Sequence, residues 1–390
     1  MQAIKDSVHD YVELPPVAEA LLDTGPVQRL RHIKQLSTVR LVYPSANHTR
    51  FEHSVGVAHL AGRALDRLDI ESQQAKAVQA AALLHDVGHG PYGHQTEGII
   101  ERRLGQHHDE VGDLLADGDL ADVLERHDLN PDEVAALVAG DGELGQLVAG
   151  ELDVDRMDYL VRDAHHTGVP YGTVDYGRLL GALRFVDGEL VLAEGNVQTA
   201  ESLLVARALM NATVYRHHVS RIAGAMLERT SERLLDSTDC SPEEFRRFTD
   251  AELLATLRNC DATTEMADRI ARRDLFKRAV WAEWEAVPAE IVAANHEEAR
   301  EFEREIATTA GVPPEAVLLD NPGEPSMPES STRVVVNGEV RRLGDKSPLV
   351  QGLQASQRTQ WRFGVYAPDE QTDEVANAAR TVLGLRDLTP

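Results

Sequence analysis

The sequence predicts a mainly α-helical protein with a smaller α+β region at its C-terminal end. Apolar residues recur at helical spacing through most of the first 290 residues. Strand-like alternation and hairpin turn signals become frequent only after a proline-rich stretch at residues 320–332. We therefore expect an α-helical domain over residues 1–290 and an α+β region over residues 291–390.

The helical segments of the expected first domain follow one another along the chain. Residues 49–68 form a strong amphipathic pattern with His53 on its apolar face. Residues 72–87 place His85 on an apolar face, and the glycines and proline of residues 88–91 end this helix. Further helices are expected over residues 17–36, 110–128, 131–139, 151–165 and 197–236, and a hairpin near residues 183–193 with Asp187-Gly188 at its turn.

Towards the C-terminal end, the residue pattern changes from helical to strand-like. Residues 240–310 have a helical and highly charged pattern, and residues 320–332 form a linker or loop. The next segment, RVVVNGEVRRL, is typical of a hairpin with Asn337-Gly338 at its turn. A strand over WRFGVYA and a helix over residues 373–384 complete the expected α+β region.

The charge of the chain limits its partners. Five of the 39 basic residues are lysines and the other 34 are arginines, against 65 acidic residues, for a net charge of −26. This composition indicates adaptation to high salt, or else an unusually acidic protein from an ordinary cytoplasm. In both cases the overall field repels nucleic acid, which we do not expect as a partner. A phosphate substrate would need a local basic pocket.

The sequence also indicates where the protein works. No run approaches the roughly 18 apolar residues of a membrane span, so we expect no membrane partner. The N-terminal residues lack the basic and then apolar pattern of a signal peptide, which favours a cytoplasmic protein. The two cysteines, Cys240 and Cys260, are too few for a disulfide framework or a zinc ribbon.

Histidine and aspartate residues gather in a few short segments. His53 and His85 lie on the apolar faces of their helices, and Asp86 follows directly. A buried imidazole needs a partner for each ring nitrogen, and a divalent metal can be one of them. A single inward histidine is more often a hydrogen-bonded core residue. The metal interpretation therefore depends on several helices each bringing an inward histidine or aspartate.

These segments resemble a known family. QRLRHIKQL, YPSANHTRFEHSVGV, LLHDVGHGPYGH and DVDRMDYLVRDAHHTG are similar to the HD-domain metal-dependent phosphohydrolases, in the branch of the deoxynucleoside triphosphate triphosphohydrolases. The resemblance runs from about residue 4 to 220 and continues more weakly through residues 272–280. It implies a helical HD domain, a divalent metal ion and a homo-oligomer, either a dimer or a tetramer.

The resemblance also implies roles for individual residues. It selects Asp155 over Asp153 and Asp158 as the distant metal ligand. It implies that His53, His85, Asp86 and Asp155 bind metal, that His89, His94 and His108 are catalytic, and that Arg50, Arg156, Tyr159, Asp163, Arg207 and Tyr215 contact substrate.

Two positions depart from the branch. Arg156 stands where the branch often has a lysine, and Arg216 where some members have a glutamine. Arginine keeps the charge and can bind phosphate in a fork, but its reach differs. These departures bear on the substrate more than on the metal site.

Helix geometry supports part of this assignment independently. Asp155, Tyr159 and Asp163 are spaced four residues apart and share one helix face. Arg207 and Tyr215 share a face of a later helix in the same way. Without the resemblance, the tyrosines are as well explained by core packing, and Arg207 by a surface ion pair.

The expected chemistry is hydrolysis of a phosphoester in a nucleotide, with release of triphosphate from a deoxynucleoside triphosphate. The ligand types accept Mn, Fe, Mg, Zn or Ni and do not decide among them. Three arginines, Arg50, Arg156 and Arg207, can balance phosphate charge, and His94, or else His89, can protonate the leaving oxygen. One alternative is a related phosphohydrolase acting on nucleoside monophosphates, cyclic nucleotides or alarmones. A second alternative is a nucleotide sensor with weak turnover.

Overall fold

The computed structural model describes residues 3–70 and 72–386, so the outermost residues of the two expected regions lie outside the described residues. Contacts divide the chain into two compact units. The first comprises residues 1–213, 240–253 and 328–351, and the second comprises residues 214–239, 254–327 and 352–390. Both units are discontinuous in sequence. The boundary expected near residue 290 stays a prediction.

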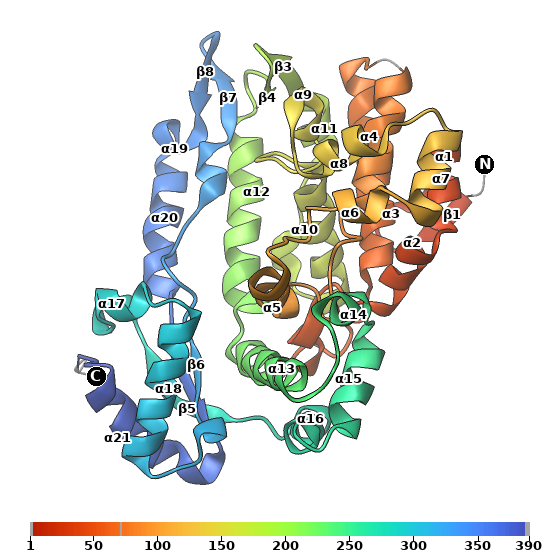
Figure 1. Ribbon diagram of the computed structural model, residues 1–390. Helices are drawn as coiled ribbons and strands as arrows, with labels where there is room; N and C mark the ends of the chain where they lie inside the picture. Colours follow the sequence, from red (N-terminus) through yellow and green to blue (C-terminus); the bar gives the residue numbers. More distant parts are fainter. Residues whose placement is uncertain (1–2, 71, 387–390) are drawn as a thin grey trace. The chain divides into compact units, whose positions relative to one another are not determined.

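Helices dominate the first unit, as the sequence predicts (Figure 1). The long helix α3, Arg50–Leu68, packs against α4, Ser72–Leu84, and against α10, Val154–Thr167. A capping box of Thr49 and Glu52 begins α3, and Asp69 ends it in the left-handed region at φ 54°. The other helices are α1 Pro16–Leu22, α2 Gly25–Arg29, α5 His94–Leu104, α6 Gly112–Leu115, α7 Gly118–Arg126, α8 Pro131–Val138, α9 Gly142–Gly145, α11 Tyr176–Ala182, α12 Val197–Met210, α14 Pro242–Arg247 and α19 Leu343–Lys346.

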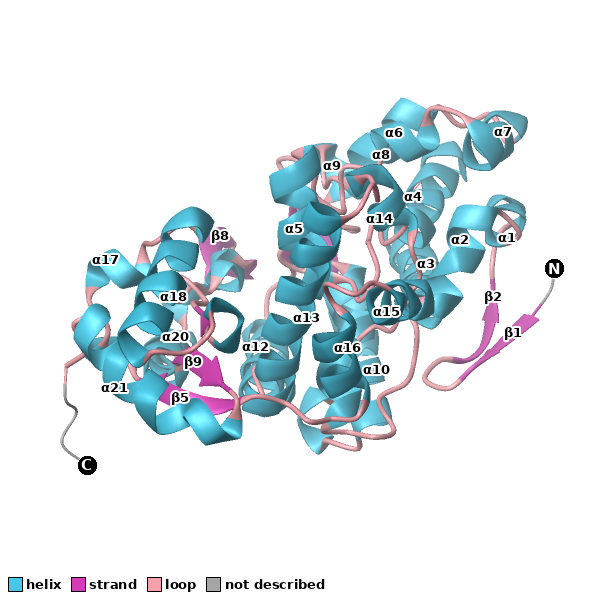
Figure 2. Ribbon diagram, turned by 60° about the horizontal axis from the view of Figure 1, so that its bottom comes forward, coloured by secondary structure: helices cyan, strands magenta, loops and turns pink. Residues whose placement is uncertain are grey.

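Two small sheets belong to the first unit. Strands β1, Ala3–Asp6, and β2, Asp10–Glu13, form an antiparallel hairpin that leads into α1 (Figure 2). The second sheet has the order β3-β4-β7-β8, with strands Leu183–Val186, Glu189–Leu192, Arg333–Val336 and Glu339–Arg342. It joins the two hairpins expected at Asp187-Gly188 and Asn337-Gly338 through a parallel pairing of Leu192 with Val334.

The second unit combines helices with a three-stranded sheet of order β5-β9-β6. The central strand β9, Phe363–Ala367, is buried along its whole length, and α18 and α21 contribute to the same apolar core. The remaining elements are β5 Lys277–Ala282, β6 Leu318–Asp320, α13 His218–Ser237, α16 Thr264–Ala271, α17 Ala289–Val292, α18 His296–Ala310 and α21 Thr372–Val382; α15 Asp250–Asn259 and α20 Pro348–Gln360 each have residues in both units.

Several expected elements differ from the structure. The helix expected over residues 17–36 is two short helices, because Gly25 and Pro26 start a new helix after Thr24. The helix over residues 110–128 is split at Gly118, which has a φ of +74°. The helix over residues 197–236 is interrupted by a π-helical turn at Asn211–Tyr215.

The helical pattern over residues 240–310 was also wrong in part, because this range contains β5. The alternating residues Val280 and Ala282 are buried, and β5 pairs with β9. Among the described residues, no helix is both long enough and apolar enough to cross a bilayer.

Gly56 allows α3 to approach α10 closely. A Cβ atom at this position would lie 2.0 Å from an oxygen of Asp158 and 2.4 Å from a guanidinium nitrogen of Arg162. Both side chains are fully buried and form an ion pair. Only glycine leaves room for this pair beneath α3.

We expect Gly56→Ala to lower the free energy of unfolding by roughly 3 kcal/mol or more, because the methyl group must displace a buried ion pair. Urea denaturation measures the change. Gly181→Ala is the matched control, since no atom lies within 4 Å of its added Cβ. Equal effects of the two substitutions would contradict this account of Gly56.

Candidate metal centre

Three helices bring four predicted ligands to one place in the first unit. His53 lies in the first turn of α3, and Asp155 in the first turn of α10. His85 and Asp86 follow directly after α4, which ends at Leu84. Because α3 packs against both other helices, side chains from all three converge.

The donor atoms of these residues are close together. Nε2 of His53 lies 2.8 Å from Oδ1 of Asp155 and 3.2 Å from Nε2 of His85. Nε2 of His85 lies 3.5 Å from Oδ1 of Asp86 and 3.7 Å from Oδ1 of Asp155. Ligands about 2.1 Å from a common metal ion are themselves separated by roughly 3 Å. The spacing is therefore suitable for one divalent ion.

The outer nitrogens of both imidazoles are fixed by hydrogen bonds. Nδ1 of His85 donates to the backbone oxygen of Ala82 at 2.8 Å, and Nδ1 of His53 donates to Oδ2 of Asp158 at 2.8 Å. These bonds direct both Nε2 atoms towards the shared space. The same arrangement orients histidine ligands in metal sites generally.

One oxygen of Asp86 indicates whether a cation would fit between these side chains. This oxygen, Oδ2, is buried and has no hydrogen-bond partner among the described residues. A buried carboxylate oxygen without a partner is costly, and a metal ion would satisfy it. The residues present therefore fit a divalent metal ion, which the four predicted ligands His53, His85, Asp86 and Asp155 would hold.

The other two aspartates near the start of α10 have different tasks. Asp153 is the N-cap of α10 and accepts from the backbone N–H of Arg156 and of Gly150. Asp158 accepts from His53, as described above. The geometry thus gives a physical reason to prefer Asp155 as the predicted ligand, which is the aspartate that the resemblance selects.

The site has strongly perturbed acid–base properties. Burial opposes the negative charge of Asp86 and so raises its pKa. The Arg50 guanidinium and the neighbouring His85 nevertheless hold the pKa of Asp86 well below its usual value. Burial likewise disfavours the charged ring of His53, but Asp155 and Asp158 raise its pKa to about 10. In the absence of a metal ion, a proton on His53 thus balances the surrounding carboxylates.

A second group of side chains lies beside the metal ligands. His89 approaches Asp86, with Nε2 3.3 Å from Oδ1, and its ring stacks on that of His108 at 3.9 Å. His94 lies edge-on to His89 at 4.6 Å. Glu97 accepts hydrogen bonds from Nδ1 of His94 and Nδ1 of His108. The structure thus brings the three predicted catalytic histidines together.

Arg50 contacts Asp86, one of the predicted metal ligands, directly. Its Nη1 lies 2.8 Å from Oδ1 of Asp86, and the side chain is 2% exposed. Gly93 makes this position possible, because its φ is +54° and an added Cβ would lie 2.4 Å from Nη2 of Arg50. A cation fixed beside the metal ligands can balance charge on a phosphate group.

The remaining predicted substrate contacts have varied surroundings. Nε of Arg207 lies 3.3 Å from the Tyr159 hydroxyl, which places these two residues together. Asp163 is buried and accepts from Nε2 of His48 at 2.8 Å. Arg156 donates from Nη1 to the backbone carbonyls of Gly150 and Glu151, just before α10 begins. Tyr215 belongs to the second unit, so its role stays a prediction.

The loop that carries His89 is fixed by residues distant in sequence. Arg246 donates from Nε to the backbone oxygen of Gly88, and Arg29 donates from Nη2 to the backbone oxygen of His89. Asp250 accepts from the backbone N–H of Tyr92, whose φ is +59°. The segment from 240 to 253 therefore stabilises an otherwise irregular loop.

Several of these contacts were missed by sequence reasoning. Glu97 follows His94 by three residues on a helix, a spacing that signals an intrahelical contact. Asp158 follows Asp155 by three residues on α10, so its position on the same helix is also visible in the sequence. By contrast, Arg246 and Asp250 gave no local signal, because their partners lie more than a hundred positions away.

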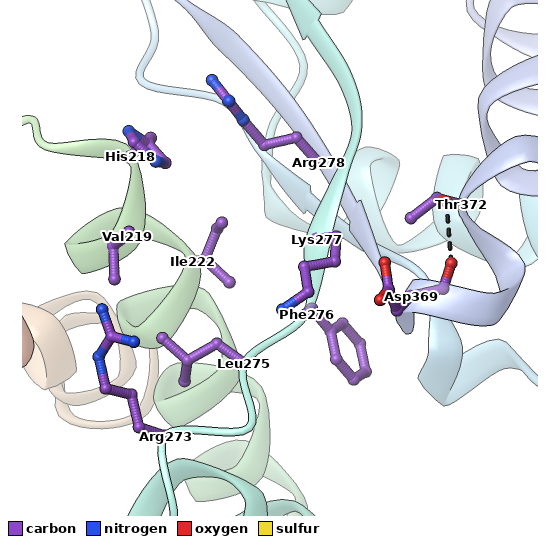
Figure 3. Close-up of a pocket in the computed structure, with 10 residues that line it drawn as sticks. All are labelled: His218, Val219, Ile222, Arg273, Leu275, Phe276, Lys277, Arg278, Asp369 and Thr372. Carbon is purple, nitrogen blue, oxygen red and sulfur yellow. Dashed lines mark hydrogen bonds between the residues drawn. The ribbon is translucent and has the colours of Figure 1, made fainter.

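The second unit has a separate pocket of about 440 Å³ (Figure 3). Arg273, Lys277 and Arg278 contribute positive charge to its lining, and Asp369 contributes a carboxylate. The lining is thus locally basic in a chain of net charge −26. Its lining residues are distinct from those that converge on the metal centre.

We expect Arg246→Ala to lower the free energy of unfolding by roughly 2–3 kcal/mol, because it removes charged hydrogen bonds to the loop carbonyl, Gln106 and Asp113. Arg247→Ala is the matched control, since this neighbour is exposed. Urea denaturation measures the free energy of unfolding of the two variants. Unfolding of both variants at the same urea concentration would contradict the proposed clamp on the loop.

We also expect His59 and His166 to disfavour the folded state of the metal-free protein increasingly as pH falls from about 6.5 towards 4. Burial, and then neighbouring imidazoles, lower the pKa values of His59 and His166 to about 4. Both rings are neutral in the folded chain but take up a proton near pH 6.5 when unfolded, so acid favours unfolding. Urea denaturation at several pH values measures this. A double variant, His59→Asn with His166→Asn, should become more stable relative to the wild type as pH falls through this range, and a constant difference between the two proteins would contradict the assignment.

Comparison with known proteins places this geometry in a family. Residues 50–163 match the family model described as HD domain, and residues 174–389 match the one described as HD associated region. An uncharacterised protein of Methanocaldococcus jannaschii is 30% identical over 392 residues, which cover 96% of this chain and 81% of that protein.

Two further similarities bear on fold and activity. The deoxynucleoside triphosphate triphosphohydrolase SAMHD1 homolog of Dictyostelium discoideum is 30% identical over 305 residues, which cover 70% of this chain but only 59% of that protein. A solved structure of a hypothetical protein from Aquifex aeolicus has a TM-score of 0.77 and 27% identity, covering 97% of this chain and 99% of its own. Together with the two family models, these similarities show that the chain belongs to the HD-domain phosphohydrolase superfamily.

Proposed function

We propose that the protein is a metal-dependent phosphohydrolase that releases triphosphate from deoxynucleoside triphosphates. The observation that carries the proposal is the convergence of His53, His85, Asp86 and Asp155, together with a buried oxygen of Asp86 that has no hydrogen-bond partner among the described residues. A divalent ion bound there would lower the pKa of a water molecule and orient it for attack on phosphorus. The Dictyostelium relative bears the name of such an activity.

Side chains around the proposed ligands would bind the substrate. Arg50, which is already desolvated beside Asp86, would balance charge on a phosphate oxygen. Tyr159 and Arg207, which contact each other, would bind the nucleoside end of the substrate. Arg156 would contribute only after giving up its bonds to backbone carbonyls.

A general acid must protonate the leaving oxygen. His94 is our first choice, because its side chain is 63% exposed and its Nδ1 is held by Glu97 at 2.6 Å. His89 is our second choice, but its ring is buried, and burial together with Arg50 and His108 holds its pKa well below the usual value. His108 would support the pair by sharing Glu97.

Other properties stay proposals as well. We propose a cytoplasmic protein that assembles into a dimer or a tetramer. The metal could be Mn, Fe, Mg, Zn or Ni, since imidazole and carboxylate ligands accept all of them.

The proposal predicts triphosphate and a deoxynucleoside as the products from metal-loaded protein and each deoxynucleoside triphosphate. Phosphorus NMR distinguishes triphosphate from pyrophosphate and phosphate. Turnover should fall to background in Asp155→Ala and after chelation, because both remove the metal. The exposed His107→Ala, outside the group of catalytic histidines, should keep full activity.

Two outcomes would contradict this prediction. Cleavage of monophosphates, cyclic nucleotides or alarmones with intact deoxynucleoside triphosphates would favour a different substrate class. Tight nucleotide binding without turnover by metal-loaded protein would favour a sensor.

A further inference from the structure

Asp158 is the central residue of a buried network behind the metal ligands. Its side chain is fully buried, and its two oxygens accept four hydrogen bonds. Oδ2 accepts from Nδ1 of His53 at 2.8 Å and from Nε of Arg162 at 2.8 Å. Oδ1 accepts from Nε2 of His9 at 2.6 Å and from Nη2 of Arg162 at 3.0 Å. A carboxylate has about four acceptor positions, so none is left for a metal ion.

His9 reaches this network from the N-terminal hairpin. It lies in the turn between β1 and β2, yet its side chain is only 1% exposed. Asp6 shapes the turn by accepting from the backbone N–H groups of Val8 and His9. Asp6 also pairs with Nη1 of Arg162 at 2.8 Å. The turn is therefore attached to the network at two points.

The charges of the network favour an ionised Asp158. Its two oxygens face the guanidinium of Arg162 and the imidazoles of His53 and His9, all of which can donate hydrogen bonds to a carboxylate. An ionised carboxylate only accepts hydrogen bonds, so His53 must carry its proton on Nδ1. The Nε2 atom of His53 is then the atom available as a ligand.

We propose that Asp158 is a positioning residue for the metal ligand His53, and that His9 of the N-terminal hairpin holds Asp158 in place. The hairpin of residues 3–13 is thus part of the metal centre although it supplies no ligand. The inference rests on the metal ion of the proposed function but not on its substrate. A carboxylate behind a histidine ligand raises the basicity of the ring and restricts its orientation.

Metal affinity tests the inference directly. Mn²⁺ is titrated into metal-free protein, and free Mn²⁺ is counted by electron paramagnetic resonance. We expect Asp158→Asn to weaken Mn²⁺ binding by roughly 10- to 100-fold. His9→Phe keeps an aromatic ring but removes the donor, so we expect a smaller loss in the same direction. His9→Gln retains a side-chain N–H and should recover part of the affinity.

The control separates positioning from a general effect of the hairpin. Tyr11→Ala alters the same hairpin at a residue that is 64% exposed, and it should leave Mn²⁺ affinity unchanged. A merely structural role would lower the melting temperature of the His9 variants without changing their Mn²⁺ affinity. If Asp158→Asn does not fold, the two His9 variants decide between these outcomes.

The results also distinguish this inference from the proposed function. Wild-type affinity in both His9 variants and in any folded Asp158→Asn protein would overturn the inference, whatever the activity. A wild type that binds Mn²⁺ but leaves nucleotides intact would contradict only the proposed function. A wild type that binds neither Mn²⁺ nor Ni²⁺ would contradict the metal centre and this inference with it.

Discussion

The burial of several carboxylates between three packed helices is the constraint on which the rest of the first unit depends. A buried carboxylate is tolerated only when cations and hydrogen-bond donors surround it. Asp86 has Arg50 on one side and histidines on the other, and Asp158 has Arg162 together with two imidazoles. The second oxygen of Asp86 is one of the buried atoms for which the described residues supply no hydrogen-bond partner.

This constraint explains features that seem unrelated in sequence. Gly56 and Gly93 lack side chains because a Cβ atom would collide with Asp158 and Arg50, respectively. The N-terminal hairpin and the segment from 240 to 253 both fold back onto the site and supply hydrogen bonds that local structure cannot. The segment from 240 to 253 thus stabilises the irregular backbone after α4, whereas the hairpin stabilises Asp158 on α10.

The sequence predicted the features that depend on local pattern. His53 and His85 could be identified because helical spacing places them among apolar residues, and the two hairpin turns carry Asp-Gly and Asn-Gly signals. The role of Asp158 could not be predicted in this way. Asp153, Asp155 and Asp158 lie within six residues, and their helix positions alone do not show which hydrogen bonds Asp158 accepts. The π-helical turn at Asn211–Tyr215 contains no glycine or proline, so the sequence did not predict an interruption of the helix there. The placement of the substrate contacts stays a prediction.

Metal content is the most direct test of the account, because every other role assigned here assumes an ion between the three helices. Elemental analysis of protein purified without chelators should find about one divalent metal ion or more per chain. That metal should be lost from a folded variant in which both His53 and His85 are replaced by alanine. Wild-type protein that is metal-free and takes up no divalent ion, or a double variant that retains the same metal content, would contradict the central claim.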